Sequence, residues 1–180
     1  MEKIVSVPLT RENAKELCAG DIVKISGVIY TARDAAHKRM TESVSRGEEL
    51  PIDIKNAVIY YAGPSPAKPG AVIGSCGPTT SGRMDAYAPT MISLGETGMI
   101  GKGELGDGVV EAMKEHGAVY FGAIGGAGAL ISKSIKSAEV VAYEDLGAEA
   151  IRRLEVEDFP AIVVIDSKGN NLYRKNLKNF

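Results

Sequence analysis

The chain has 180 residues, close to the usual size of one globular domain, so we expect a single domain over residues 1–180. Hydrophobic residues make up 44% and charged residues 24%, a balance too apolar for a disordered chain. The 21 Lys and Arg against 23 Asp and Glu give a net charge of −2, which argues against a general nucleic-acid or polybasic membrane binder.

No segment has the pattern of a membrane span or a secretory signal. The longest uncharged run, residues 118–131, is rich in glycine and shorter than the roughly 20 residues that a bilayer requires. Met1, Glu2 and Lys3 lead directly into an alternating strand pattern instead of a basic and then apolar signal. We therefore expect a soluble, cytoplasmic protein.

Strand and helix patterns alternate at the start of the chain. Thr10 is placed to cap a helix that Gly20 ends, and Gly47 follows a run of strong helix formers. The predicted elements of this part are a strand over residues 4–7, a helix over 11–18, a strand over 21–30 and a helix over 33–46.

The rest of the chain continues with short β-rich runs. Three prolines between residues 63 and 70 predict a loop there, and Gly117 ends a helical pattern. The predicted strands are 58–62, 71–75, 118–124, 139–143, 161–166 and 172–174; the predicted helices are 107–116 and 130–135; turns are predicted at 125–128 and 167–170. This order indicates one α/β domain with a partly parallel, mixed sheet and flanking helices.

The chain has two cysteines and two histidines as candidate metal ligands: Cys18, Cys76, His37 and His116. A structural zinc site needs about four ligands at close spacing, and an iron–sulfur cluster usually takes three or four thiolates. Because the two cysteines are far apart and have too few companions, we expect this chain alone to hold no metal or cluster.

The richest candidate site follows the predicted strand at 71–75. Thr79, Thr80 and Ser81 come after a glycine and a proline, and Arg83 and Asp85 follow them. Free backbone N–H groups at a helix start favour an anion, and an arginine adds a bidentate carboxylate contact. The alternative is that these hydroxyls are ordinary helix caps and that Asp85 is a cap or a salt link.

A second candidate lies at the end of the predicted strand over 21–30. Arg33 and His37 are one helical turn apart, at a position where open sheets place ligands. The alternative is a solvated basic helix face on which Asp34 is an internal partner. His116 precedes Gly117 and fits a cation at the end of a helix.

A third candidate is the glycine-rich segment over residues 95–103, which contains Lys102. It fails as a P-loop because Glu96 holds a required glycine position and Gly103 stands where Ser or Thr would bind magnesium. A second glycine run fails as a dinucleotide fingerprint, because Ile131 replaces its last glycine. A lysine between glycines is still suited to a small anion.

Together these segments resemble the β subunit, or C-terminal domain, of the class I fumarate hydratase and L-tartrate dehydratase family. The matching segments are TARDAAHKR at residues 31–39, GPTTSGRMD at 77–85, GKG at 101–103 and FPA at 159–161. The resemblance implies the swivelling β/β/α fold and a hydro-lyase that adds water to, or removes it from, a four-carbon dicarboxylate. It also implies a four-iron four-sulfur cluster on a separate α subunit, in an α2β2 assembly, and no cluster on this chain.

The resemblance also implies roles for single residues. By it, Thr79 is the catalytic base, Thr80 binds substrate beside it, and the carboxylates are bound by Arg33, Arg83 and Lys102. His37 and Asp85 are expected in the outer shell of the site, and Cys76 is expected to be a buried neighbour of the threonines.

Two alternatives stay open at this stage. One is the β subunit of L(+)-tartrate dehydratase, which shares the motifs and forms oxaloacetate. The other, of a different class, is a non-catalytic module whose glycine-rich turns bind a phosphate or another ligand. For either enzyme we expect an exposed apolar patch where the α subunit docks.

Overall fold

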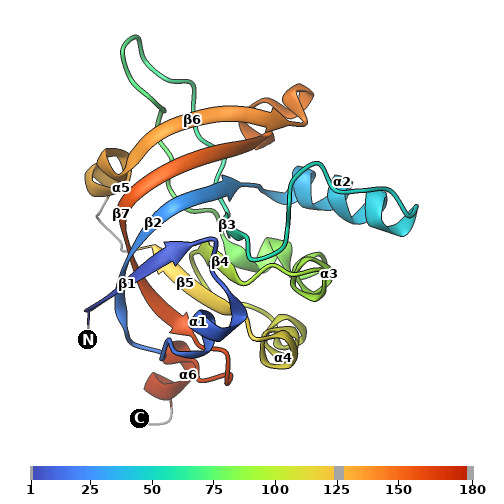
Figure 1. Cartoon of the computed structure of the whole chain (residues 1–180), viewed down its shortest axis with the longest axis vertical. Coiled ribbons are helices and arrows are strands. Elements are labelled where there is room, and N and C mark those ends of the chain that lie inside the picture. Colours follow the sequence, from blue (N-terminus) through green and yellow to red (C-terminus); the bar gives the residue numbers. More distant parts are fainter. Residues whose placement is uncertain (1, 124–127, 178–180) are drawn as a thin grey trace.

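The computed structural model describes residues 2–123 and 128–177 and shows a strongly curved sheet with helices packed beside it (Figure 1). The strands are β1 (Glu2–Val7), β2 (Ile22–Thr31), β3 (Val58–Tyr60), β4 (Gly98–Gly101), β5 (Val119–Ala123), β6 (Ile135–Ala142) and β7 (Ile151–Ile165). The α-helices are α1 (Arg11–Lys15), α2 (Asp34–Ser45), α3 (Ala88–Ser93), α4 (Asp107–His116), α5 (Gly128–Ser134) and α6 (Leu172–Leu177). Two 3-10 turns complete the set, η1 (Ser81–Met84) and η2 (Glu144–Glu149).

The sheet is mixed, and its pairings close on themselves. Strands β1 to β5 pair in order, each parallel to the next. The long strand β7 is antiparallel to β2, β5 and β6, so it joins the first and last parts of the parallel run. The prediction of an α/β fold with a mixed sheet and flanking helices is confirmed.

Alternating side chains divide the core into two layers. On β3, Val58 and Tyr60 point into the closed sheet, where they meet apolar side chains of β2 and β7. Ile59 and Tyr61 point the other way and pack under α2, α3 and α4. Because both faces of β3 are buried, its sequence is a continuous apolar run, as parallel strands require.

Some element boundaries follow directly from local signals in the sequence. Helix α4 begins and ends as predicted, and Gly117 closes it with φ of 81°, a left-handed conformation that favours glycine. The Thr10 hydroxyl accepts a hydrogen bond from the Asn13 N–H at 3.2 Å, which is the predicted cap of α1. Helix α1 is nevertheless shorter than predicted, since it ends at Lys15.

The predicted strand over residues 71–75 is wrong. This segment belongs to a loop that projects from the sheet beside β6 (Figure 1), where the Ser65 N–H donates to the Ser75 carbonyl at 2.9 Å. Strand β3 has β2 on one side and β4 on the other, so this segment does not pair with it. Val72 in this loop is 49% exposed.

Two further predictions at the C-terminal side need correction. Residues 172–174 begin helix α6 and not a strand, because the Asn171 side chain accepts a hydrogen bond from the Tyr173 N–H at 3.0 Å and so starts a helix. The strand predicted over 161–166 is only the last part of β7, which begins at Ile151. The turn predicted at 125–128 lies almost wholly outside the described residues.

The described part of the chain contains no helix long and apolar enough to cross a membrane.

Candidate active site

The predicted site residues lie at one edge of the sheet, where parallel strands β2, β3 and β4 end. Arg33 comes two residues after β2, and Lys102 comes directly after β4. The backbone links the strand ends in order, since the Ala32 N–H donates to the Tyr60 carbonyl at 3.1 Å. Carboxyl ends of parallel strands are where open α/β sheets bind ligands. The three separate motifs are therefore brought to one edge.

Main-chain hydrogen bonds fix the threonine segment at this edge. The Thr79 N–H donates to the Tyr61 carbonyl at 2.7 Å, and the Thr79 carbonyl accepts from the Lys102 N–H at 3.4 Å. Thr80 pairs with Lys102 as an isolated parallel bridge, and the Ser81 N–H donates to the Lys102 carbonyl at 2.8 Å. Thr79 is half-buried, whereas Thr80 and Lys102 are exposed.

A buried hydroxyl pair supports this bridge from below. Ser81 Oγ lies 2.7 Å from the Tyr120 hydroxyl, which in turn donates to the Gly103 carbonyl at 2.8 Å. A Cβ added at Gly101 would lie 2.0 Å from Ser81 Oγ, so only glycine fits there. Gly101 thus makes room for a buried hydroxyl, while Lys102 beside it is exposed.

Arg83 and Asp85 follow on η1 with different roles. Arg83 is exposed. The Asp85 carboxylate accepts a hydrogen bond from the Gly106 N–H, with each oxygen 3.1 Å from that nitrogen, at the start of α4. Asp85 therefore stabilises the start of α4, in agreement with the alternative prediction that Asp85 is a helix cap. Thr80 precedes η1 without a side-chain capping hydrogen bond, which argues against the cap interpretation for its hydroxyl.

Arg33 lies between two acidic side chains. Its Nε is 3.8 Å from an Asp34 oxygen and 3.8 Å from a Glu149 oxygen, and its side chain is 26% exposed. Gly63 packs closely against the Arg33 side chain, because a Cβ built at Gly63 would lie 2.9 Å from Arg33 Cδ. Within the described residues, Arg33 Nε has no hydrogen-bond partner.

His37 is not on a solvated helix face. It is fully buried, with its ring edge-on to Tyr61 at a centroid distance of 5.3 Å. Burial lowers the pKa of His37 to about 4, so the ring is neutral at neutral pH. Its Nδ1 lies 2.9 Å from the Arg33 carbonyl, which can only accept, so the proton is on Nδ1. The histidine therefore holds the main chain of Arg33.

The two cysteines have no place at this edge as metal ligands. Cys76 is buried, which raises the pKa of its thiol to about 12, and its carbonyl accepts from the Tyr60 hydroxyl at 2.5 Å. Cys18 is exposed near the other end of β2. Across residues 2–123 and 128–177, no three His, Cys, Asp or Glu side chains gather into a group that could hold a metal ion.

Sequence reasoning missed Glu149 and Gly63 as parts of this site, and it missed that Ser81 is buried. Glu149 lies far from Arg33 in the sequence, and no spacing rule connects a residue in η2 to the start of α2. Ser81 belongs to the predicted threonine segment, but only the fold shows that its hydroxyl is buried against Tyr120. Gly63 was assigned to a proline-rich loop, and its contact with Arg33 is visible only in three dimensions.

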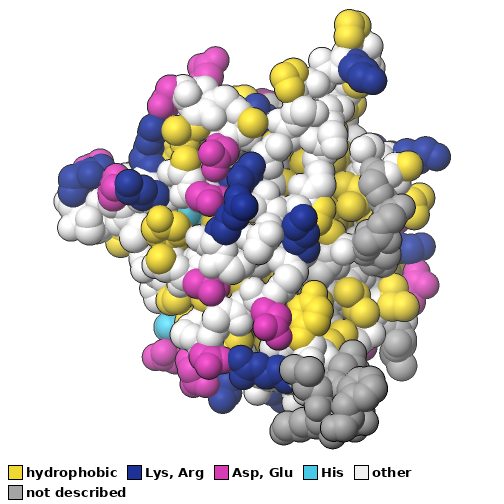
Figure 2. All heavy atoms as spheres, turned by 180° about the vertical axis from the view of Figure 1, so that it is seen from behind, with side chains coloured by type: hydrophobic (Ala, Val, Ile, Leu, Met, Phe, Trp, Pro, Cys, Tyr) yellow, Lys and Arg dark blue, Asp and Glu magenta, His cyan; other side chains and the backbone are white. Residues whose placement is uncertain are grey.

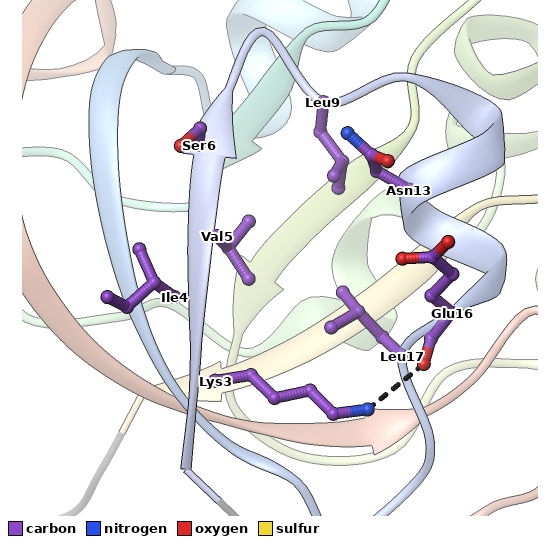
Figure 3. A pocket seen from close by; sticks show the side chains of 8 residues that line it. All are labelled: Lys3, Ile4, Val5, Ser6, Leu9, Asn13, Glu16 and Leu17. Carbon is purple, nitrogen blue, oxygen red and sulfur yellow. Dashed lines mark hydrogen bonds between the residues drawn. The ribbon is translucent and has the colours of Figure 1, made fainter.

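Thr80, Arg83 and Lys102 are exposed, and a cavity lies elsewhere in the molecule. A cavity of about 390 Å³ separates β1 from α1 and has Val5, Leu9 and Leu17 on its apolar side (Figure 3). None of its lining residues is a predicted site residue. Figure 2 shows Lys and Arg side chains near the centre of the face opposite to that of Figure 1, among acidic and exposed apolar ones.

Comparison with known proteins places the chain in a family. The model of the family described as Fumarase C-terminus matches residues 2–176. "Fumarate hydratase 2" of Leishmania major is 43% identical over 169 residues, which is 93% of this chain and 30% of that protein. "Fumarate hydratase class I, aerobic" of Escherichia coli is 44% identical over 155 residues, 85% of this chain and 28% of that protein.

A shorter relative matches along most of its length. The "Putative L(+)-tartrate dehydratase subunit beta" of Methanocaldococcus jannaschii is 40% identical over 173 residues, 93% of this chain and 89% of that protein. The chain thus spans about a third or less of the fumarate hydratases and nearly all of a β subunit. Both names denote hydro-lyases. This chain belongs to the Fumarase C-terminus family.

Proposed function

We propose that this chain is the β subunit of a class I fumarate hydratase, which interconverts fumarate and (S)-malate together with a separate α subunit. One observation carries the proposal: Arg33, Thr79 and Lys102 come from three separate motifs and lie at the same edge of the sheet, with Thr79 hydrogen-bonded to Lys102. Cations beside a hydroxyl at a strand end suit a small dianionic substrate.

Three cations would bind the two carboxylates of the substrate. Arg83 and Lys102 are exposed on η1 and after β4, and Arg33 is one quarter exposed at the end of β2. Because a guanidinium can bind a carboxylate with two parallel hydrogen bonds, the arginines would fix its orientation. Thr80, bridged to Lys102, would add a hydroxyl contact from the same segment.

Thr79 would take the proton from the substrate carbon in the elimination and return it in the hydration. Its main chain is held on both sides, by the Tyr61 carbonyl and by the Lys102 N–H. A threonine hydroxyl is a weak base, so its alkoxide must be stabilised by nearby cations or donors. We assign this stabilisation to Lys102, whose main-chain N–H donates to the Thr79 carbonyl at 3.4 Å.

A partner chain is part of the proposal. Thr80, Arg83 and Lys102 are exposed, whereas an elimination benefits from a site that excludes water. The chain matches 89% of a relative named as a β subunit, which supports a separate α subunit. The described residues do not fit an iron–sulfur cluster, so we assign the four-iron four-sulfur cluster to that α subunit, in an α2β2 assembly with one swivelling β/β/α domain per β chain.

A second candidate is the β subunit of L(+)-tartrate dehydratase. The observation in its favour is the match to the Methanocaldococcus jannaschii protein, which is a separate subunit of similar length. The same cations would bind tartrate, a dicarboxylate with one more hydroxyl. Two fumarate hydratases are 45% and 44% identical to the chain, against 40% for the tartrate dehydratase subunit, so we propose fumarate as the first choice of substrate.

The deciding experiment is anaerobic purification of the tagged chain from its own host, followed by assays with fumarate and with L-tartrate. Fumarate hydration by an eluate that contains an iron-rich second chain would support the proposal. Tartrate dehydration without fumarate hydration would select the second candidate. A chain that purifies alone, binds no dicarboxylate and turns over neither compound would refute both.

A further inference from the structure

An acidic side chain from a distant part of the chain faces the Arg33 guanidinium. Glu149, the last residue of η2, has one carboxylate oxygen 3.8 Å from Arg33 Nε. The same oxygen accepts a hydrogen bond from the Ala35 N–H at 3.4 Å. Ala35 lies in the first turn of α2, where the N-cap residue Arg33 makes no side-chain capping bond. Glu149 therefore contacts both the charge and the helix that carries it.

The segment that presents Glu149 is itself tied down by two arginines. Arg152 donates to the carbonyls of Gly147 at 3.1 Å and Ala148 at 3.2 Å. Arg39, on α2, makes two 2.8 Å hydrogen bonds to the Asp145 carboxylate. The two Arg39–Asp145 bonds join α2 to η2, so they fix the position of Glu149 relative to Arg33.

The Arg33 side chain is confined from the other side too. A Cβ at Gly63 would lie 2.9 Å from Arg33 Cδ and 3.0 Å from the Ala148 carbonyl. The arginine thus occupies a slot between the end of β3 and η2. The distance given to each acidic side chain is from Nε, and within the described residues no hydrogen bond engages the two terminal nitrogens.

We propose that Glu149 is a positioning residue for Arg33. It holds the Nε side of the guanidinium, which leaves the terminal nitrogens to a carboxylate of the substrate. A free arginine side chain samples many rotamers, and fixing it before binding lowers the cost of binding. The inference rests on the proposed function, since it deepens the role given there to Arg33.

The kinetic test uses the αβ complex with three variants of this chain. Glu149→Gln keeps an oxygen for the Ala35 N–H but removes the charge, and Glu149→Ala removes both. Glu144→Gln is the matched control, because it removes a charge from the same turn at an exposed position. We expect KM for the dicarboxylate to rise about tenfold in both Glu149 variants, with kcat within about twofold of wild type.

The other kinetic outcomes would overturn the inference. Wild-type KM in Glu149→Gln, with a defect only in Glu149→Ala, would mean that Glu149 is merely a helix cap. A lower KM in Glu149→Gln would mean that Glu149 competes with the substrate for Arg33. An equal rise in Glu144→Gln would mean that only the overall charge matters.

A second measurement does not depend on activity. Phenylglyoxal modifies arginine side chains, and mass spectrometry of the digested full chain gives the rate at Arg33. We expect that rate to rise at least about threefold in Glu149→Gln and to stay at the wild-type value in Glu144→Gln, because a carboxylate partner protects a guanidinium. An unchanged rate would overturn the inference. If the wild-type complex turned over neither dicarboxylate, the proposed function would fail while this rate would still decide the role of Glu149.

Discussion

Acidification should destabilise this protein through His37. The ring is fully buried, and burial lowers its pKa to about 4 from its ordinary value of 6.5. In the unfolded chain the imidazole takes up its proton near pH 6.5, whereas in the folded chain it stays neutral down to about pH 4. The stabilising contribution is therefore present above pH 6.5 and is lost as the pH falls toward 4.

The magnitude follows from the difference between the two pKa values. Each pKa unit corresponds to about 1.4 kcal/mol, so the full loss is about 3 kcal/mol below pH 4. At pH 5 most of the unfolded chains carry the proton and few folded ones do, which gives a loss of about 2 kcal/mol relative to pH 7.5. That is a large part of the stability of an ordinary domain.

Denaturant unfolding of the full chain at pH 7.5 and at pH 5 measures the His37 contribution as a difference between wild type and a variant. His37→Phe has no titrating ring, so its change in stability from pH 7.5 to pH 5 should be more favourable than that of wild type by about 2 kcal/mol. His116→Asn is the matched control and should keep the wild-type change, because His116 is partly exposed at the end of α4. Equal changes in wild type and His37→Phe would refute the assignment of the acid loss to His37.

Four further predictions concern the site and its support. Thr79→Ala should reduce kcat of the αβ complex by at least about a thousandfold while the subunits still co-purify; near-normal kcat would remove Thr79 as the base. Arg83→Ala should chiefly raise KM for the dicarboxylate, and an unchanged KM would remove it from the carboxylate clamp. Gly101→Ala should lower the free energy of unfolding by about 2–4 kcal/mol, because its Cβ meets a buried hydroxyl at 2.0 Å. Gly108→Ala is the control and should not lower the free energy of unfolding, because Gly108 has open space around it. Equal stabilities of the two variants would contradict the close packing at Gly101. Glu96 is fully buried with neither carboxylate oxygen hydrogen-bonded within the described residues, and burial raises its pKa well above 4.5. Its contribution is therefore lost as the pH rises, which is opposite in sign to that of His37. Glu96→Gln should lose less stability than wild type when the pH is raised, and an unchanged pH dependence of stability would count against this assignment.

Local chemistry in the sequence determined many elements of the fold. Helix α4 follows from an acidic first turn, a basic last turn and the glycine that ends it, and each of these acts within one helical turn. The motifs around Arg33, Thr79 and Lys102 were also visible in the sequence, because carboxylate binding requires cations and hydroxyls of those types. The family could be recognised from the same segments, and the comparisons confirm it.

Other features depended on which segments become neighbours. Residues 71–75 have the composition of a strand, but β2 and β4 occupy both sides of β3 and the segment lies in a loop. Residues 172–174 begin a helix because Asn171 caps them. The first outcome depends on which strands become neighbours, whereas the second follows from a local cap that outweighs β propensity.

The sequence by itself determined the residue types of the site and the local signals of its helices, since these act over a few residues. Only the tertiary structure decided that His37 is buried and neutral under Arg33 and that Glu149, from the far end of the chain, faces the same guanidinium. Burial and long-range pairing arise when the sheet closes through β7, and that closure joins segments whose separation in the sequence carries no information about their contact.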